Sequence, residues 1–117
     1  MMERNLTISL QPDWKAALRA TAKRATANAY QGEVLNFETP AQFFGKLTEK
    51  RWELVRVAQG RGELSVRELA RLVGRDVKRV HEDVTLLATL GILERTALGG
   101  LICPFTSVHI DMYLETA

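Results

Sequence analysis

The chain has 117 residues, of which 46% are hydrophobic and 26% are charged, and its formal net charge is +2. These proportions are typical of a globular protein and exclude the disordered, collagen-like and membrane classes. No apolar run approaches the roughly 20 residues of a membrane span, the N-terminus has no signal-peptide pattern, and the single cysteine cannot form an intrachain disulfide. We therefore expect a cytoplasmic protein with no membrane partner.

The first thirty residues predict a strand and then a long helix. Apolar and polar residues alternate over 4–10, with Leu6 and Ile8 on the same face, which indicates a half-buried strand. Pro12 is a favoured first helical residue, and a mostly alanine stripe continues the helix to about Tyr30.

Three shorter elements follow. Gly32 ends the long helix, and residues 33–38 predict a short strand. Residues 39–42, TPAQ, are a typical helix start, and Thr48 is positioned to cap another helix over residues 49–59.

Residues 65–102 form the most informative segment. Residues 65–68, SVRE, are a capping box for a helix that ends at Gly74, because glycine enters the left-handed region without steric cost. Asp76 is positioned to cap a second helix, residues 77–90. Its expected buried face consists of Val77, Val80, Val84, Leu87 and Leu90.

A hairpin is predicted after the second helix. Gly91 ends that helix, and residues 92–97 and 101–105 read as strands joined around Gly99-Gly100, with a final strand over 108–114. Helix, turn, helix and hairpin are the elements of a winged helix-turn-helix, whose second helix enters the major groove of DNA. We therefore predict an α+β, mainly α fold, with a winged helix-turn-helix domain over residues 37–117.

Removing the expected buried positions leaves a polar outward face on the second helix. The forked guanidinium groups of Arg75 and Arg79 match guanine O6 and N7, and Lys78 suits a phosphate. Backbone amides at the helix that follows Ser65 suit a second phosphate, and the hairpin would contact the flanking backbone or minor groove. The predicted DNA-binding residues are Ser65, Arg75, Lys78, Arg79, His81, Glu82, Thr85, Arg95, Thr96, Gly99 and Gly100.

Residues 1–36 are interpreted as a strand-helix dimerisation arm. A winged helix does not need thirty further residues at its front, and a two-fold dimer would space two recognition helices for a palindromic site. The alternative is that these residues cover the domain's own core. The predicted dimer contact consists of Leu6, Ile8, Trp14, Leu18, Ala22 and Ala25.

The sequence contains no recognisable enzyme signature, so we expect no catalytic residues and no cofactor. His81 and His109 are the only histidines, and with one cysteine they form no recognisable zinc pattern, so no metal site is expected. Cys103 has no basic neighbour in sequence, and we expect an inert, partly buried thiol.

Two runs, FETPAQFFGKLTEKRWELVRVAQ and SVRELARLVGRDVKRVHEDVTLLATLGILE, carry a resemblance to a known class. They resemble small prokaryotic winged-helix regulators of the MarR/ArsR-like type, in particular predicted regulators that often lie beside toxin genes as antitoxins. The resemblance implies double-stranded DNA binding at the regulator's own promoter and, more loosely, a cognate toxin partner. The chain lacks the Cys pair or His cluster of metal-sensing ArsR-like proteins.

The leading hypothesis is a homodimeric, sequence-specific DNA-binding repressor. An alternative class is a protein-interaction module, such as an antitoxin that neutralises its toxin directly. A third, a small-molecule or redox sensor, would need a pocket between the front helix and the core.

Overall fold

The structure is a computed structural model, and it describes residues 3–10 and 32–112. Within these ranges the fold is α+β, with four helices, a three-stranded sheet and a short hairpin, which confirms the predicted mixture of helix and strand. The described elements are β1 (Asn5–Leu10), β2 (Glu33–Phe37), α2 (Pro40–Lys46), α3 (Glu49–Ala58), α4 (Val66–Val73), α5 (Val77–Leu90), β3 (Glu94–Arg95), β4 (Leu101–Ile102) and β5 (Ser107–Asp111).

The chain divides into two units, and the second is continuous in sequence. One unit contains residues 1–45 and 107–117, and the other contains residues 46–106. The expected division lay between residues 36 and 37, with the final strand in the second domain. The structure places the division elsewhere, because the final strand pairs with the first strand and not with the hairpin.

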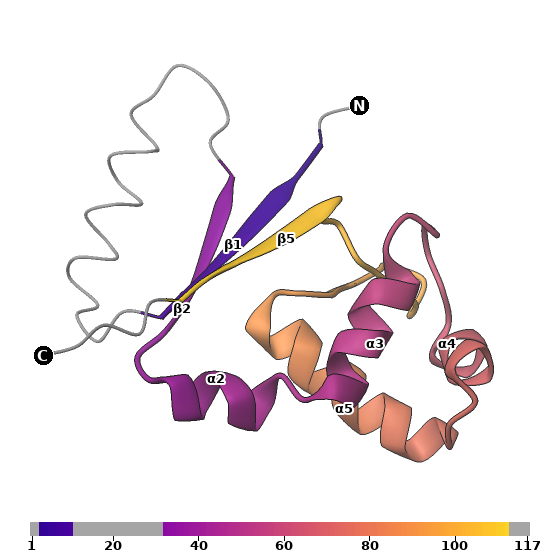
Figure 1. Ribbon diagram of the computed structural model, residues 1–117. Helices are drawn as coiled ribbons and strands as arrows, with labels where there is room; N and C mark the ends of the chain where they lie inside the picture. The colour runs from indigo at the N-terminus through magenta and orange to yellow at the C-terminus, as the bar shows by residue number, and fades with distance from the viewer. Residues whose placement is uncertain (1–2, 11–31, 113–117) are drawn as a thin grey trace, which may run out of the picture. The chain divides into compact units, whose positions relative to one another are not determined.

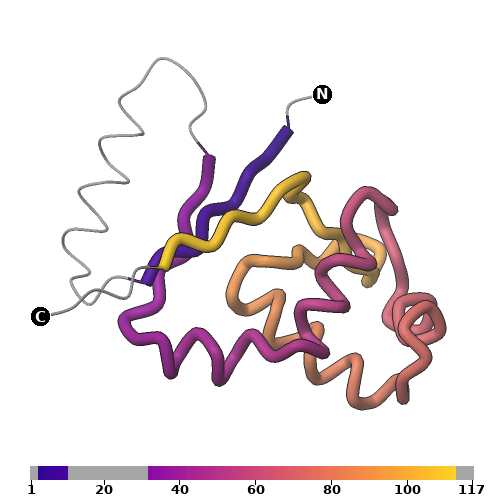
Figure 2. The backbone as a smooth tube through the Cα atoms, viewed as in Figure 1, coloured from indigo at the N-terminus to yellow at the C-terminus, as the bar shows by residue number. Residues whose placement is uncertain are grey.

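The sheet of the first unit has the order β2-β1-β5, and both pairings are parallel. Figures 1 and 2 show β1, from the start of the chain, lying between β2 and β5. Ile8 is in register with Leu35 on one side and with Ile110 on the other, so these three side chains belong to the same sheet face. The alternation over residues 4–10 therefore predicted the first strand correctly, but it carried no information on its partners.

Leu6 and Ile8 were predicted to contact a second copy of the chain, and the structure contradicts this. Both are core residues of a single chain, with exposed fractions of 4% and 0%. Their side chains are covered within the chain, and β1 is the central strand, so neither of its edges is open to a strand of a second copy. The other predicted dimer contacts, Trp14, Leu18, Ala22 and Ala25, lie outside the described residues, as does the helix predicted to begin at Pro12.

The second unit has a core formed by α3, α4 and α5, each of which packs against the other two (Figure 1). Its fully buried side chains come from all three helices and from the segment after α5, and burial of each such aliphatic side chain contributes about 1.5–3 kcal/mol. They include Leu54, Val55, Leu69, Val80, Val84, Leu87, Ile92, Leu93 and Leu101.

The predicted helix starts of this unit are confirmed. Thr48 caps α3, its side chain accepting a hydrogen bond from the amide of Arg51. Ser65 and Glu68 form the reciprocal capping box of α4. Asp76 caps α5 by accepting from the amide of Arg79. These starts were readable because a cap depends on residues within three positions of one another.

Two details of the second unit differ from the prediction. The buried face of α5 is shorter than expected: Val77 is 39% exposed and Leu90 is half-buried, because they are the first and last residues of the helix. The hairpin is shorter than predicted, with two residues in each strand. The second strand of the hairpin also pairs with the segment before α4: the backbone N–H and C=O groups of Leu101 and Leu64 form two reciprocal hydrogen bonds of 2.8 Å.

Candidate nucleic-acid interface

A three-residue turn connects α4 to α5. Gly74 has a φ of +68° and donates its backbone N–H to the last carbonyls of α4, and the amide of Arg75 donates to the carbonyl of Ala70 at 3.0 Å. Asp76 then starts the next helix. The left-handed conformation at position 74 reverses the chain within one turn, so the two helices pack directly against each other.

The outward face of α5 is polar and begins with two bases. Val80, Val84 and Leu87 are fully buried, whereas Lys78, Arg79, His81, Glu82 and Thr85 are exposed. The first turn of α5 contains no acidic residue. Because a helix N-terminus carries partial positive charge, Lys78 and Arg79 are unfavourably placed for the isolated helix, and a bound anion would reverse that effect.

A groove of about 710 Å³ joins the start of α4, one flank of α5 and the tip of the hairpin. It is lined by five of the predicted residues, Ser65, Lys78, His81, Glu82 and Gly99, together with Val66, Arg67 and Val77. Ser65 and Gly99 are far apart in sequence, so the tertiary structure is what brings this part of the predicted site together.

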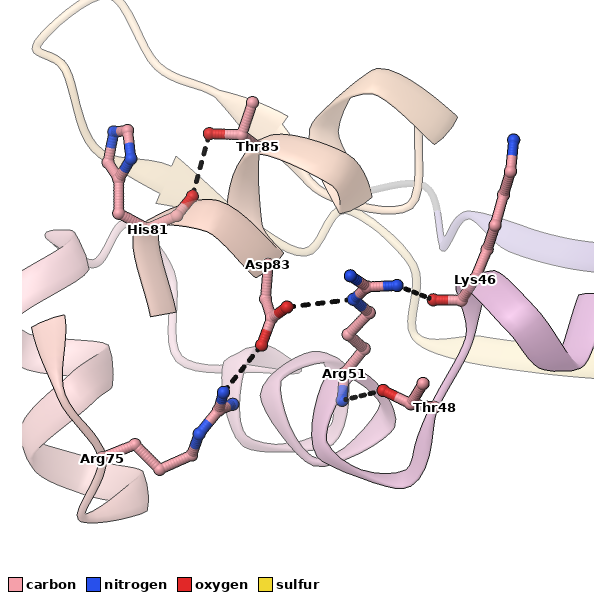
Figure 3. Close-up of polar contacts among 7 residues, drawn as sticks. All are labelled: Lys46, Thr48, Arg51, Arg75, His81, Asp83 and Thr85. Carbon is pink, nitrogen blue, oxygen red and sulfur yellow. Dashed lines mark hydrogen bonds and ion pairs between the residues drawn. The ribbon is translucent and has the colours of Figure 1, made fainter. Parts of the chain in front are cut away.

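A side-chain hydrogen bond connects the hairpin to α5. Arg95 donates to the hydroxyl of Thr85 at 3.1 Å, and that hydroxyl donates to the carbonyl of His81 at 2.8 Å (Figure 3 shows the second bond). Thr96 accepts the amide of Gly100 at 2.9 Å. Thr85 thus connects α5 to the hairpin, and its hydroxyl both accepts and donates within the chain. Thr96 accepts a hydrogen bond inside the hairpin, and its O–H can still donate.

Gly100 was predicted to lie at the hairpin tip, but the structure buries it against a neighbouring segment. A Cβ at this position would lie 2.9 Å from the carbonyl oxygen of Leu64 and 2.9 Å from Cγ of Glu63. Close approach of two backbones explains the glycine here, and the exposed tip consists of Leu98 and Gly99, with Leu98 87% exposed.

We expect Gly100→Ala to lower the free energy of unfolding by about 1–3 kcal/mol, because the new methyl group displaces the hairpin from the Leu64 backbone. Urea denaturation followed by circular dichroism measures the change. Leu98→Ala is the matched control, expected to stay within about 0.5 kcal/mol because its side chain is exposed. Equal stability of the Gly100→Ala protein and the wild type would contradict the close packing.

Arg75 does not occupy the position predicted for it. Its Nη2 donates to Asp83 at 2.8 Å, and Arg51 of α3 donates to the other carboxylate oxygen of Asp83 at 3.0 Å. Figure 3 shows the two guanidinium groups meeting this one carboxylate. The side chain of Arg75 is 18% exposed. Its guanidinium is therefore committed to the fold, which argues against the predicted pairing with guanine.

Asp83 is the centre of this ion-pair network. Burial raises the pKa of its carboxyl group, but the hydrogen bonds and charges of Arg75 and Arg51 outweigh burial, and the pKa lies below its ordinary value of 3.8. Arg51 also donates to the carbonyl of Lys46 at 2.7 Å (Figure 3). The network connects α3, the turn and α5, so it sets how the outward face of α5 is presented.

A second hollow lies on the other flank of α5. It measures about 190 Å³ and is lined by Thr48, Lys50, Arg51, Arg75, Arg79, Glu82 and Asp83. Lys50, Arg51 and Asp83 were not predicted as members of a site. Bases at positions 50 and 51, in the first turn of a helix where acids are favoured, were the available signal.

Cys103 is buried, with an exposed fraction of 6%, and its Sγ lies 3.7 Å from the carbonyl oxygen of Phe105. Burial raises the pKa of the Cys103 thiol, and the charge of Glu94 raises it further, against the hydrogen bond to Phe105. A buried thiol with a raised pKa is a poor nucleophile, in agreement with the inert role expected from sequence.

Two further findings concern residues 3–10 and 32–112 only. In these ranges no three His, Cys, Asp or Glu side chains gather in a group able to hold a metal ion. The helices in the same ranges are too short or too polar to cross a membrane.

The geometry defines a small α+β fold in which two consecutive helices and a hairpin line one groove. The chain belongs to the HVO_A0114 family, whose sequence model matches residues 46–110, more than half of the chain. No curated protein is significantly similar to the chain. The match begins at the first residue of the second unit. All predicted DNA-binding residues lie inside it, and all predicted dimer contacts lie outside it.

Proposed function

We propose that this protein is a sequence-specific DNA-binding transcription regulator of the winged helix-turn-helix type. The observation that carries the proposal is the groove in which the start of α4, the outward face of α5 and the hairpin tip converge. In such proteins the second helix of the motif enters the major groove and the hairpin lies against the flanking DNA. A helix with its side chains is about 10–12 Å across, and the major groove is about 12 Å wide.

The residues around the groove divide into phosphate and base contacts. Lys78 and the free amides at the start of α4, beside Ser65, suit phosphates on one side of the major groove. Arg79 suits a guanine edge, and Glu82 suits the amino group of cytosine. Arg95 and Gly99 suit the flanking backbone. Arg75 is left out of this set because Asp83 holds it.

The charge of the second unit supports the proposal. Residues 46–106 contain eleven Lys and Arg against eight Asp and Glu, whereas the rest of the chain has an excess of one acid. The positive excess therefore belongs to the unit that presents α5. Because DNA binding releases counterions, this excess favours association with the phosphate backbone.

The regulatory part of the proposal rests on the resemblance stated above. It includes repression at the protein's own promoter and a homodimer that spaces two α5 helices for a palindromic site. Since Leu6 and Ile8 are internal, the dimer contact would use other residues. Sedimentation equilibrium tests the dimer independently of DNA.

The test of the function is a fluorescence anisotropy titration of the full chain against duplex DNA from its own upstream region. We expect saturable binding that is at least about 1,000-fold tighter than binding to unrelated duplex and that weakens steeply with salt. Equal affinity for all duplexes, or none, would overturn the proposal. A partner protein that co-purifies through high salt, in the absence of DNA binding, would instead support the protein-interaction alternative.

A further inference from the structure

The hollow between the start of α3 and the far flank of α5 carries an uncompensated positive charge. Four cationic side chains line it, Lys50, Arg51, Arg75 and Arg79, against the two carboxylates of Glu82 and Asp83. Both carboxylate oxygens of Asp83 are engaged by Arg51 and Arg75. In the part of the chain that the structure describes, neither Lys50 nor Arg79 forms an ion pair, so the excess is not neutralised internally.

The guanidinium of Arg75 adds a second observation. Its Nη2 binds Asp83, while its Nη1 is buried and has no hydrogen-bond partner. A buried cation with an unsatisfied donor is costly unless an opposite charge lies nearby. One carboxylate shared by two guanidinium groups compensates half of their charge, so an anion in the adjoining hollow would be stabilised by both.

The backbone around the hollow also favours an anion. Thr48 caps α3 and accepts the amide of Arg51, which leaves the amides of the preceding first-turn residues without partners in the helix. Lys50 lies in that first turn, where a base is unfavourable for the isolated helix. Glu49 is the acidic residue of the same turn. A bound anion would be attracted both by the helix N-terminus and by Lys50.

We propose that this hollow binds a phosphate group, and that in the DNA complex the group is a backbone phosphate of the strand opposite the one held near Ser65. This inference rests on the proposed function. A helix in the major groove has a phosphate backbone on each side, and the two hollows lie on the two flanks of α5, with Glu82 lining both. Lys50 is the direct contact, Arg79 lies at the rim, and Arg51 and Arg75 supply charge from beneath.

The first experiment compares Lys50→Gln with wild-type full-length protein in DNA titrations at several salt concentrations. Loss of one phosphate contact reduces the slope of log affinity against log salt by about 0.9, and it weakens binding by the same factor for two unrelated duplexes. Arg56→Gln is the matched control, since Arg56 is an exposed base in the last turn of α3. Its slope should equal that of the wild type.

The second experiment uses inorganic phosphate alone as the probe. Phosphate should shift the amide resonances of residues 48–51 in the wild type, beyond the effect of chloride at equal ionic strength, and these shifts should be lost in Lys50→Gln. This arm separates a free phosphate from a DNA phosphate, and it does not depend on DNA binding.

The two arms distinguish the failure of each proposal. DNA binding by the wild type with an unchanged slope in Lys50→Gln would overturn the phosphate site and leave the proposed function standing. Phosphate-dependent shifts without any DNA binding would overturn the function and assign the hollow to a free phosphate-bearing anion. No DNA binding and no shifts would overturn both.

Discussion

Replacing Asp83 with asparagine is expected to lower the free energy of unfolding by about 2–3 kcal/mol. The carboxylate is 14% exposed and accepts from Arg75 and Arg51, and both guanidinium groups stay partly buried when its charge is removed. An amide keeps the shape but presents one NH₂ group toward a guanidinium donor. Removing one partner of a buried charge pair is strongly destabilising, and partial exposure moderates the loss here. Urea denaturation at neutral pH measures it.

The same variant makes a prediction for pH. Because the folded-state pKa of Asp83 is lowered below 3.8, its contribution is fully present above that value and is lost as the pH falls through the folded pKa. The stability difference between the wild type and Asp83→Asn should therefore be constant near neutral pH and shrink below about pH 4. A difference that grows on acidification would contradict the assigned ion pairs.

Glu82→Gln is the matched control for Asp83→Asn. It removes the adjacent carboxylate, but that side chain is exposed and forms no ion pair among the described residues. We expect a change within about 0.5 kcal/mol. An equal loss of stability in the two variants would mean that stability depends on the total negative charge of α5, and not on the ion-pair network that connects α5 to α3.

Reversing both bases at the start of α5, with Lys78→Glu and Arg79→Glu, is expected to weaken duplex DNA binding by about 100-fold or more. Each good base contact is worth about 1–3 kcal/mol, and a reversed charge adds repulsion from the phosphates. Both side chains are exposed, and the amide of Arg79 that Asp76 caps is retained. The free energy of unfolding should not fall, because acidic residues are favoured in the first turn.

The control for the double variant is Arg56→Glu with Arg61→Glu. It changes the net charge equally at exposed positions of the same unit, outside both hollows. Its affinity for duplex DNA should fall much less, because this variant loses only long-range attraction to the phosphates. The same loss in both double variants would show that DNA association is diffuse and would remove the assignment of the interface to α5.

The ion pair of Arg75 changes which residues are expected to contact DNA. From sequence it read as a base-contacting arginine at the start of the second helix. Its pairing with Asp83 instead connects the α4–α5 turn to the ion pair that reaches α3. In the proposed interface the base contacts then rest on fewer residues, led by Arg79, while Arg75 and Arg51 bind Asp83 of the same helix.

Local features of the second unit were predictable from sequence. The caps at Thr48, Ser65 and Asp76 and the left-handed residues Gly74 and Gly91 all act within a few positions of the chain. Helical periodicity likewise identified the three buried residues of α5, Val80, Val84 and Leu87, but it also assigned Val77 and Leu90 to the buried face. Each of these signals consists of residues that are close together in sequence, so it can be recognised without knowledge of the fold.

Other features depended on residues far apart in the chain. Arg75 forms an ion pair with Asp83 on α5, and Asp83 also pairs with Arg51 on α3. Burial of Gly100 requires the Leu64 backbone. Neither partner is marked by a short-range pattern, and for that reason both residues were assigned to DNA contact. The parallel pairing of β1 with β5 is another such case, and it moved the boundary between the units.

The sequence by itself determined where the described helices begin, where α4 and α5 end, which face of α5 is apolar, and that the chain contains a helix, turn, helix and hairpin in succession. Only the tertiary structure decided which polar side chains remain available. It places Ser65, His81 and Gly99 in the lining of one groove, and it pairs Arg75 with Asp83. The physical reason is range: capping and periodicity act over one helical turn, whereas charge pairing and backbone packing act between whichever residues the fold brings together.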